Sequence, residues 1–458
     1  MRRQTPPPAL TGARMTDHIA IVGGGFSGTL LAINLLRFDG PRATLIEREG
    51  ERIARGVAYS ATEPGHLLNV RAAGMSAFPD DPDHFVRWLA ARDGGAGTSF
   101  VPRQRYGAYL RETLDAVRDD RLALVEGDVA GIEAGGVRLA DGRRIAAARV
   151  VLATGNLPPH TPPGIDPSAL PDDRYLDDPW RAEPGRGLGA EDTIVLLGTG
   201  LTAVDVALQL DAAGFAGTVV ALSRRGLRPR RHLDGLPPVA GEIDLPGVPL
   251  SHTIARVRAR AVEEGWRAAV DRLRPITQRL WAASDPAVRA RFLRHLRPFW
   301  DVHRHRLAPA VADRIDAMAA GGRLRFVAGK IVSAEPDGMG ACLRWRPRHA
   351  DGVEALRVAR IINCTGPQGD LTRTDDPLLA RLIADGRIRP DPLRLGIEVD
   401  ADARVIDREG QADEQLSCIG PMTRGGLWEV VAVPDIRRQA WDLARRLSNA
   451  QWVGGEGL

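Results

Sequence analysis

Two stretches of the chain show the same order of a short apolar run, a glycine-rich turn and a longer apolar segment. In the first, His18-Ile-Ala-Ile-Val22 is followed directly by Gly23-Gly-Gly-Phe-Ser-Gly28 and then by Thr29–Leu36. A short continuous apolar run is typical of a buried parallel strand, and the segment after the turn has the apolar spacing of a helix. A second predicted strand, Ala43–Glu47, ends in an acid. The pattern therefore predicts a β-α-β unit.

The same order recurs later in the chain. The apolar run Thr193–Leu197 leads into Gly198-Thr-Gly-Leu-Thr-Ala203, a helical stretch follows over Val204–Leu210, and Thr218–Leu222 has the composition of the next strand. The two turns begin 175 residues apart, at Gly23 and Gly198. This period is too long for a small solenoid repeat, and it fits two separate nucleotide-binding domains.

Two further apolar strands end in similar turns. Arg149-Val-Val-Leu-Ala-Thr-Gly155 and Arg360-Ile-Ile-Asn-Cys-Thr-Gly366 are each followed by prolines, which stop the chain from continuing as a helix. We interpret them as the places where the chain passes between domains, so that the second unit is inserted into the first.

Apolar residues at helical spacing over 254–273 and 289–300 predict a helical subdomain in the insertion. The predicted fold is α/β with two Rossmann-like dinucleotide-binding domains: a disordered tail at 1–15, a first domain at 16–185 and 335–458, and a second domain at 186–334 with a helical insertion at about 250–320.

The three glycines of the first turn have separate physical roles. Gly23 permits the tight turn, Gly25 lets the backbone approach a pyrophosphate, and Gly28 lets the helix pack closely on the strand. Exposed backbone N–H groups and the positive end of the helix then face the phosphates. Glu47 lies where a carboxylate can accept hydrogen bonds from both hydroxyls of an adenosine ribose, which favours an unphosphorylated ribose. The first domain is therefore predicted to bind a dinucleotide with an unphosphorylated ribose, such as FAD, and in oxidoreductases with two dinucleotide-binding folds the one that opens the chain usually carries FAD.

The second turn differs from the first where its second strand ends. Its third glycine is replaced by Ala203, a variant that still allows close packing. In place of the acid stands Ser223, followed by Arg224 and Arg225. A carboxylate would repel a 2′-phosphate, whereas serine and guanidinium groups bind it through charge-assisted hydrogen bonds. The second domain is therefore predicted to bind NADPH, and the alternative is that these arginines only solvate a surface turn.

Composition limits the other function classes. The chain has 458 residues, enough for two domains with substantial cores, and its net charge is only +4. Nearly every basic residue is Arg, which is weak support for nucleic-acid binding without a clustered basic face. The sequence contains no apolar run long enough to cross a membrane. Cys342, Cys364 and Cys418 are widely separated and have neither disulfide nor zinc-ligand spacing, which predicts a cytoplasmic protein with no metal site.

Several motifs together resemble a known family. The two glycine-rich turns, Ala153-Thr-Gly155 and Asn363-Cys-Thr-Gly366 are similar to those of class B flavin monooxygenases and their relatives. The resemblance covers nearly the whole chain from His18 to Arg438. More narrowly, four segments resemble a bacterial FAD/NAD(P)-binding protein family: Arg55-Gly-Val-Ala-Tyr59, His66-Leu-Leu-Asn-Val70, Met75-Ser-Ala-Phe-Pro-Asp80 and Ile419-Gly-Pro-Met-Thr-Arg-Gly-Gly-Leu-Trp-Glu429.

The resemblance implies a flavin site, with two departures from the family pattern. Asn69 lies on the segment that passes beside the isoalloxazine in related flavoproteins, and we take it, with Trp180, as a candidate catalytic residue. Capping of a loop by His66 and Asn69, and packing of a linker by Trp180, are the alternatives. The departures are Gly420-Pro421, where many relatives have Gly-Asp, and the linker around Trp180, which lacks the usual signature. The candidate cofactor-binding residues are Gly23, Gly25, Phe26, Ser27, Gly28, Glu47, Arg48, His66, Asn69, Thr154, Gly155, Gly198, Gly200, Leu201, Thr202, Ser223, Arg224, Arg225, Thr365, Gly366, Gly420 and Trp428.

The hypothesis that follows is an FAD-dependent, NADPH-using oxidoreductase. Within that class the resemblance favours a monooxygenase acting on a small molecule such as an amine or amino acid. Two alternatives remain: an NAD(P)H-dependent flavoprotein reductase or dehydrogenase without oxygen insertion, and a non-catalytic FAD-binding redox sensor. The sequence has no short-spaced cysteine pair for disulfide exchange. We expect a small-molecule substrate and neither a nucleic-acid nor a membrane partner, and we leave self-association into a homo-oligomer open.

Overall fold

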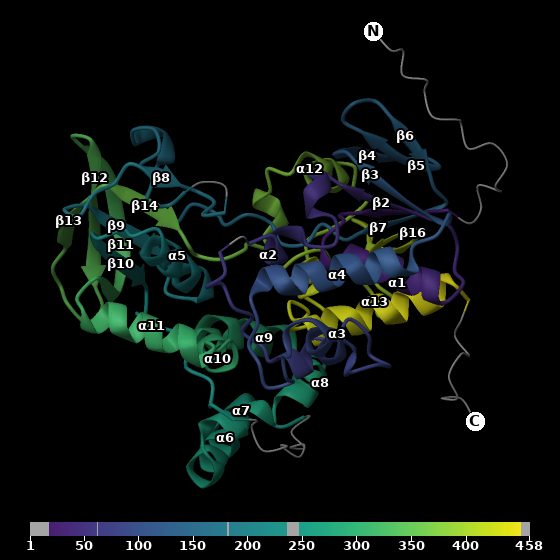
Figure 1. The fold of residues 1–458 in the computed structure, drawn as a ribbon. Helices are drawn as coiled ribbons and strands as arrows, with labels where there is room; N and C mark the ends of the chain where they lie inside the picture. The colour runs from purple at the N-terminus through teal and green to yellow at the C-terminus, as the bar shows by residue number, and fades with distance from the viewer. Residues whose placement is uncertain (1–17, 62, 181–182, 236–246, 450–458) are drawn as a thin grey trace.

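The structure is a computed structural model that describes residues 18–61, 63–180, 183–235 and 247–449. The predicted tail at 1–15 lies outside these ranges. Figure 1 shows two sheets, each with its own helices, and a further group of helices that extends away from both. The predicted α/β class with two Rossmann-type units is confirmed by the parallel pairing at the centre of each sheet. Across the described ranges, no helix is long and apolar enough to cross a membrane.

The first sheet has six strands around the first glycine-rich turn. Its central strand, β1 (Ile19–Val22), pairs in parallel with β2 (Ala43–Glu47) on one side and β7 (Arg149–Leu152) on the other. Because side chains alternate along a strand, β1 contributes two residues to the core on each face of the sheet. From one edge to the other the strands are β15 (Arg404–Ile406), β16 (Ala412–Cys418), β7, β1, β2 and β3 (Leu122–Glu126).

Helices cover one face of the first sheet, and a small antiparallel sheet covers the other. On the helical face, α1 (Phe26–Arg37) packs against α4 (Arg103–Val117) and α13 (Val433–Leu447), which lie beside it in Figure 1. The opposite core contains the three-stranded sheet and one helix. The other elements of this domain are α2 (Gly56–Tyr59), α3 (His84–Asp93), β4 (Val129–Glu133), β5 (Gly136–Leu139), β6 (Arg144–Ala146) and α12 (Pro377–Ala384).

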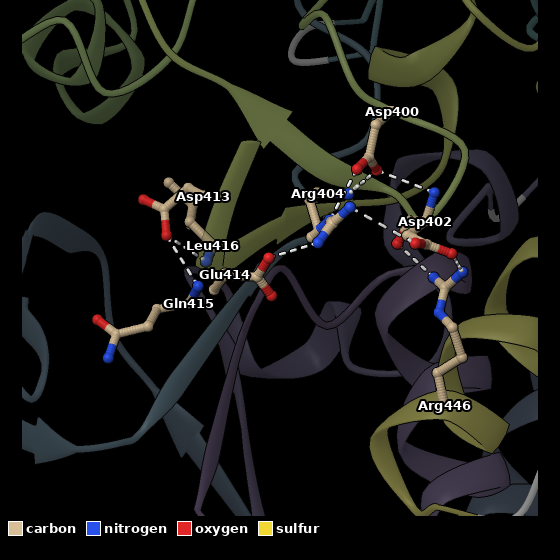
Figure 2. Close-up of polar contacts among 8 residues, drawn as sticks. All are labelled: Asp400, Asp402, Arg404, Asp413, Glu414, Gln415, Leu416 and Arg446. Carbon is tan, nitrogen blue, oxygen red and sulfur yellow. Dashed lines mark hydrogen bonds and ion pairs between the residues drawn. The ribbon is translucent and has the colours of Figure 1, made fainter. Parts of the chain in front are cut away.

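A network of ion pairs joins the edge of the first sheet to the last helix (Figure 2). Arg404, on β15, contacts the carboxylate of Asp400 at 2.7 Å and also that of Glu414 on β16. From α13, Arg446 donates to the carboxylate of Asp402 at 2.7 Å. These side chains are partly exposed, so each pair contributes little free energy by itself. Together they fix the loop before β15 between the sheet edge and α13.

The second sheet is built around the second glycine-rich turn. Helices α5 (Leu201–Ala212) and α11 (Pro309–Ala320) cover one face of it. Its longest strand pairs in parallel with one neighbour up to Ala328 and antiparallel with another from Gly329 onward, with a register shift between Ile331 and Ser333 inside the antiparallel part. From edge to edge the strands are β13 (Glu354–Val358), β12 (Gly340–Pro347), β11 (Leu324–Asp337), β10 (Thr218–Ser223), β9 (Thr193–Leu197), β14 (Arg360–Asn363) and β8 (Tyr175–Leu176).

The predicted domain limits at residues 185 and 335 do not match this topology. β12, β13 and β14 all lie beyond residue 335, and β8 precedes residue 186, yet all four belong to the second sheet. The reason is that β11 continues past the expected limit into an antiparallel pair with β12, while β14 pairs with β9, far away in the sequence. The second domain therefore takes residues from both sides of the predicted insertion.

The helical insertion has prolines at the starts of its helices. Pro298 occupies the first turn of one, where a missing N–H costs nothing. Pro286 does the same. The helix α11, inside the predicted range, packs on the second sheet. The insertion proper consists of α6 (Leu250–Glu264), α7 (Trp266–Asp271), α8 (Thr277–Ala283), α9 (Pro286–His295) and α10 (Arg297–Arg304).

Candidate functional site

Both glycine-rich turns are pressed against a neighbouring Thr-Gly turn in the same way. Gly23 has a φ of 107°, and a Cβ there would overlap the carbonyl oxygen of Ala153. Gly198 has a φ of 128°, and a Cβ there would overlap the carbonyl oxygen of Cys364. The two carbonyls follow β7 and β14, the strands beside β1 and β9. The structure thus places each Thr-Gly turn at the carboxyl edge of its sheet, where such folds bind dinucleotides.

The first residues of α1 are held closely by their surroundings. A Cβ on Gly28 would overlap the carbonyl oxygen of Gly23, so the helix approaches the strand as the sequence predicts. Gly25 precedes the helix, and its missing Cβ would lie 3.4 Å from the Cα of Gly56. The Phe26 ring packs into the domain core against aromatic neighbours. Its side chain therefore supports the turn from behind.

The N-terminus of α5 is more open. It begins at Leu201 directly after Gly200, with Thr202 in its first turn. A Cβ on Gly200 would meet no described atom within 4 Å. The first N–H groups of a helix have no partner within it, so this end offers donors to an anion.

Glu47 lies against the first glycine-rich turn. Its Oε2 accepts a hydrogen bond from the Gly24 N–H at 2.8 Å, and its Oε1 accepts one from the Glu49 N–H at 3.3 Å. A carboxylate has about four lone-pair sites, so capacity remains for two ribose hydroxyls. Arg48 instead turns to carboxylates of its own domain, with Asp128 at 3.0 Å and Asp376 at 3.2 Å.

The two Thr-Gly turns differ in how their hydroxyls are used. The Thr154 hydroxyl is buried and has no hydrogen-bond partner within the described ranges. The Thr365 hydroxyl donates to the side-chain amide oxygen Oδ1 of Asn363 at 2.7 Å. Gly155 and Gly366 have φ values of 73° and 83°, and a Cβ on either would meet open space. The Thr-Gly turn at Thr154 therefore has a hydroxyl that is unpartnered among the described residues and lies beside open space, whereas the hydroxyl of the Thr-Gly turn at Thr365 is already hydrogen-bonded.

Gly420 is fixed by contacts that its sequence context did not reveal. Its φ is 83°, and a Cβ there would overlap the hydroxyl of Ser27 on α1. Its N–H donates to the Gln439 side chain of α13 at 2.7 Å. The backbone N–H of Gly420, one of the candidate cofactor-binding residues, is therefore already engaged, and Gly420 and Ser27 are brought together at the start of α1.

His66 faces the second domain. The buried imidazole places Nε2 2.9 Å from the carbonyl oxygen of Asp205 on α5, and Nδ1 has no partner in the described structure. Asp205 also forms an ion pair at 2.7 Å with Arg103 of α4. Burial raises the pKa of Asp205, and the nearby Arg103 and His66 oppose that rise. Trp180 packs edge-on against the His66 ring, with ring centres 6.1 Å apart. The two predicted residues thus meet at the contact between the domains.

Asn69 lies at the same domain contact, where it is held by His232, a residue that was not among the candidates from the sequence. The His232 Nε2 donates to the Asn69 carbonyl oxygen at 3.0 Å, and its ring packs against Phe100. Burial lowers the pKa of His232 to about 4, and Arg306 and Arg71 disfavour its charged form further. His232 follows an arginine-rich stretch with no distinctive spacing, so no sequence signal identified it.

The side chains of the three residues predicted to bind a 2′-phosphate point to different surroundings. The Ser223 hydroxyl accepts the Gly226 N–H at 3.0 Å and contacts the Thr199 hydroxyl, so it closes the turn. The Arg225 guanidinium lies over the Phe299 ring at 5.1 Å. Arg224 is exposed and lines a cavity.

Trp428 lies between the helical insertion and the C-terminal part of the first domain. It stacks on Trp281 of α8 at 4.7 Å, and its indole N–H is buried without a hydrogen-bond partner in the described residues. The next residue, Glu429, is buried at a φ of 71° and accepts a hydrogen bond from the Trp300 indole at 2.8 Å. This segment was predicted from the sequence as part of the candidate site, but its aromatic partners in the insertion were not.

Two of the cysteines are buried in the cores of the sheets. Burial raises the pKa of the Cys418 thiol to about 12 and that of Cys364 above its usual range, so neither is a ready nucleophile. Within the described ranges, no group of three or more His, Cys, Asp or Glu side chains is arranged to hold a metal ion.

Comparisons with known proteins agree with the fold. Residues 20–157 match a family model described as FAD-NAD(P)-binding. No curated protein sequence matches the chain. Among solved structures, the chain is similar to an FAD-bound cadaverine monooxygenase of desferrioxamine biosynthesis from Erwinia amylovora, with 14% identity, a TM-score of 0.65 and 95% of each chain covered.

Two further solved structures cover almost the same length. The ornithine hydroxylase of Pseudomonas aeruginosa is 16% identical, with a TM-score of 0.63 over 95% of this chain and 99% of that chain. The L-lysine 6-monooxygenase of Pseudomonas syringae is 18% identical, with a TM-score of 0.62 over 95% of this chain and 100% of that chain. Residues 20–157 are therefore similar to an FAD-NAD(P)-binding family, and the chain as a whole has the same fold as these three solved structures.

Proposed function

We propose that the chain is an FAD-dependent, NADPH-using oxidoreductase, and that it acts as a monooxygenase on a small amine or amino acid. The observation that carries the proposal is the difference between two otherwise equivalent turns. Glu47 stands at the end of β2, and Ser223 followed by Arg224 stands at the end of β10. A carboxylate suits the free ribose of FAD, whereas a guanidinium suits the phosphorylated ribose of NADPH.

The residues around the first turn fit FAD. Glu47 is oriented by two backbone N–H groups and keeps lone pairs for ribose hydroxyls. The Thr154 hydroxyl is buried without a partner in the described structure, and space lies open at the neighbouring Gly155. Bound FAD would supply the redox chemistry, by accepting hydride from NADPH and passing electrons to O₂.

The chain's own residues would bind and orient the two cofactors and keep water out. His66, Arg103 and Asp205 hold α4 against α5, so they set the distance between the two turns. His232 fixes the backbone at Asn69, which we propose lies beside the flavin ring. Trp180 shields the His66 imidazole at this contact. A closed contact of this kind limits the access of water to reactive species.

The substrate class is proposed from the structural neighbours. The three solved structures compared above act, by their descriptions, on cadaverine, ornithine and lysine. Each carries a primary amine on a short aliphatic chain. We propose that this chain oxidises a substrate of the same type, a small primary amine or amino acid.

The test is a product analysis with the purified protein. The absorption spectrum of the protein and the nucleotide released on denaturation should identify FAD. NADPH oxidation, O₂ consumption, peroxide release and hydroxylated amine should then be measured with a panel of diamines and basic amino acids. The proposal predicts hydroxylated product in proportion to NADPH for at least one amine. Peroxide in proportion to NADPH with every amine would indicate a flavin reductase or oxidase instead, and absence of NADPH oxidation would indicate a redox sensor.

A matched pair of variants links the activity to the second turn. Arg224→Gln should raise the KM for NADPH more than the KM for NADH, because only NADPH carries the 2′-phosphate. Arg225→Gln serves as the comparison, since the Arg225 guanidinium lies over Phe299. Equal changes in the two KM values in Arg224→Gln would contradict the proposed role.

A further inference from the structure

A cavity of about 490 Å³ lies where three parts of the chain meet. Arg224 reaches it from the end of β10 in the second domain, and Arg294 reaches it from α9 of the helical insertion. Arg394 comes from the loop before β15 in the first domain. One arginine from each part therefore faces the same space, which we call the three-arginine cavity.

The charge of the three-arginine cavity is largely uncompensated. No carboxylate is among its described lining residues. In the described part of the chain, the Arg224 and Arg294 side chains take part in no ion pair or hydrogen bond, and Arg394 has only Asp370 at 3.5 Å. Guanidinium groups gathered around one space repel each other, and an anion with several oxygens would relieve that repulsion.

The rest of the lining is apolar and comes from the same segments. Leu293 and Ala290 contribute from α9, and Pro392 and Leu393 from the loop of the first domain. The volume is within the range of small-molecule sites in proteins, which are mostly apolar with a few charged groups. The lining therefore suits a ligand that combines a flat apolar group with a multiply charged anion. The adenosine 2′-phosphate end of NADPH has this chemistry.

We propose that the three-arginine cavity holds the 2′-phosphate of the nicotinamide nucleotide, with Arg294 and Arg394 as specificity residues beside Arg224. The proposal rests on the proposed use of NADPH and extends it, because Arg294 lies on the helical insertion and Arg394 lies in the first domain, both outside the second sheet and the helices that cover it. Binding of the phosphorylated nucleotide then also fastens the helical insertion to the first domain. A nucleotide without the 2′-phosphate makes no such link.

The test compares two ligands that differ only in the 2′-phosphate, namely adenosine 2′,5′-bisphosphate and 5′-AMP. Calorimetric titration of the purified protein in its FAD-loaded form gives the affinity ratio of the two. Arg294→Ala and Arg394→Gly should each lower this ratio by about tenfold, the effect of one lost charge-assisted hydrogen bond. Glycine is chosen at position 394 because its φ of 56° suits glycine. Arg291→Ala, an exposed residue of the same helix, should leave the ratio unchanged.

The outcomes separate this inference from the proposed function. A ratio unchanged in both Arg294→Ala and Arg394→Gly, or an equal loss of affinity for 5′-AMP, would overturn it. Binding does not require flavin reduction, so a preserved preference for the bisphosphate without NADPH oxidation would refute the proposed activity and leave the phosphate site standing. Conversely, NADPH oxidation together with an affinity ratio that neither Arg294→Ala nor Arg394→Gly changes would support the proposed activity and refute the phosphate site.

Discussion

The contact between His232 and Asn69 makes the domain interface sensitive to pH. His232 is largely buried, and its Nε2 donates to the Asn69 carbonyl oxygen at 3.0 Å. Burial lowers its pKa from 6.5 to about 4, and Arg306 and Arg71 oppose the charged form as well, whereas the Asn69 carbonyl and Asp271 act in the other direction. In the unfolded chain the imidazole takes up a proton near pH 6.5, but in the folded chain it does so only near pH 4. The unfolded state therefore binds more protons within this interval, and stability falls as the pH is lowered through it.

The size of the effect follows from the two pKa values. Each pKa unit corresponds to about 1.4 kcal/mol, so His232 lowers the free energy of unfolding by about 3 kcal/mol at most between pH 6.5 and pH 4. His232→Gln keeps an N–H donor for the Asn69 carbonyl and removes the titrating group. Its stability should fall less steeply with pH than that of the unmodified protein.

The assay is urea unfolding at several pH values across this interval, with the difference between variant and unmodified protein plotted against pH. Carboxylates titrate in both proteins, so their contribution cancels in the difference. His252→Gln is the control, because His252 is exposed on α6. If the difference in unfolding free energy between His232→Gln and the unmodified protein stayed constant from pH 6.5 to pH 4, His232 would not be a buried neutral imidazole.

Three further perturbations test other parts of the account. Glu47→Gln should weaken FAD binding by about tenfold in a flavin fluorescence titration, since charge-assisted bonds to the ribose are lost, while Glu49→Gln should change it little. Arg103→Leu and Asp205→Leu should each cost about 3 kcal/mol in urea unfolding, because each leaves a buried charge unpaired, and the double variant should cost less than either. If the losses of unfolding free energy in the two single variants simply add up in the double variant, Arg103 and Asp205 are not energetically coupled. Gly420→Ala should lower the melting temperature, because its φ of 83° disfavours alanine and the added Cβ overlaps a neighbouring side chain; an unchanged melting temperature would show that the turn is free to adjust.

The local features of both nucleotide-binding units could be predicted from the sequence. A glycine-rich turn between an apolar strand and a helix has few other structural explanations, and both turns lie where they were expected. Gly23 has the positive φ of the predicted tight turn, and Gly28 shows the predicted close packing of the helix on the strand. These predictions succeeded because their physical causes lie within about 30 residues of each other.

Features that depend on distant pairing could not be predicted. β14 was expected to lead back into the first domain, but it pairs with β9 in the second sheet. An apolar strand carries no sign of which sheet it joins, since buried parallel strands of both sheets have the same composition. The domain limits were therefore placed wrongly at residues 185 and 335.

The candidate site shows the same division. Glu47 was predicted from its distance to the first turn, and it lies against that turn. The partners of His66 and Asn69, which are Asp205 and His232, lie on the other domain, so no spacing in the sequence connects them. The three-arginine cavity is a further case, because its residues come from three separate segments of an arginine-rich chain.

The central claim is that FAD on the first fold receives hydride from NADPH on the second. It is tested most directly by anaerobic titration of the purified protein with NADPH and, separately, with NADH, while the flavin absorbance is recorded. The account predicts that FAD copurifies with the protein or can be restored to it, and that NADPH bleaches the flavin at much lower concentration than NADH does. A protein that holds no flavin, or a flavin that NADPH leaves oxidised, would contradict it.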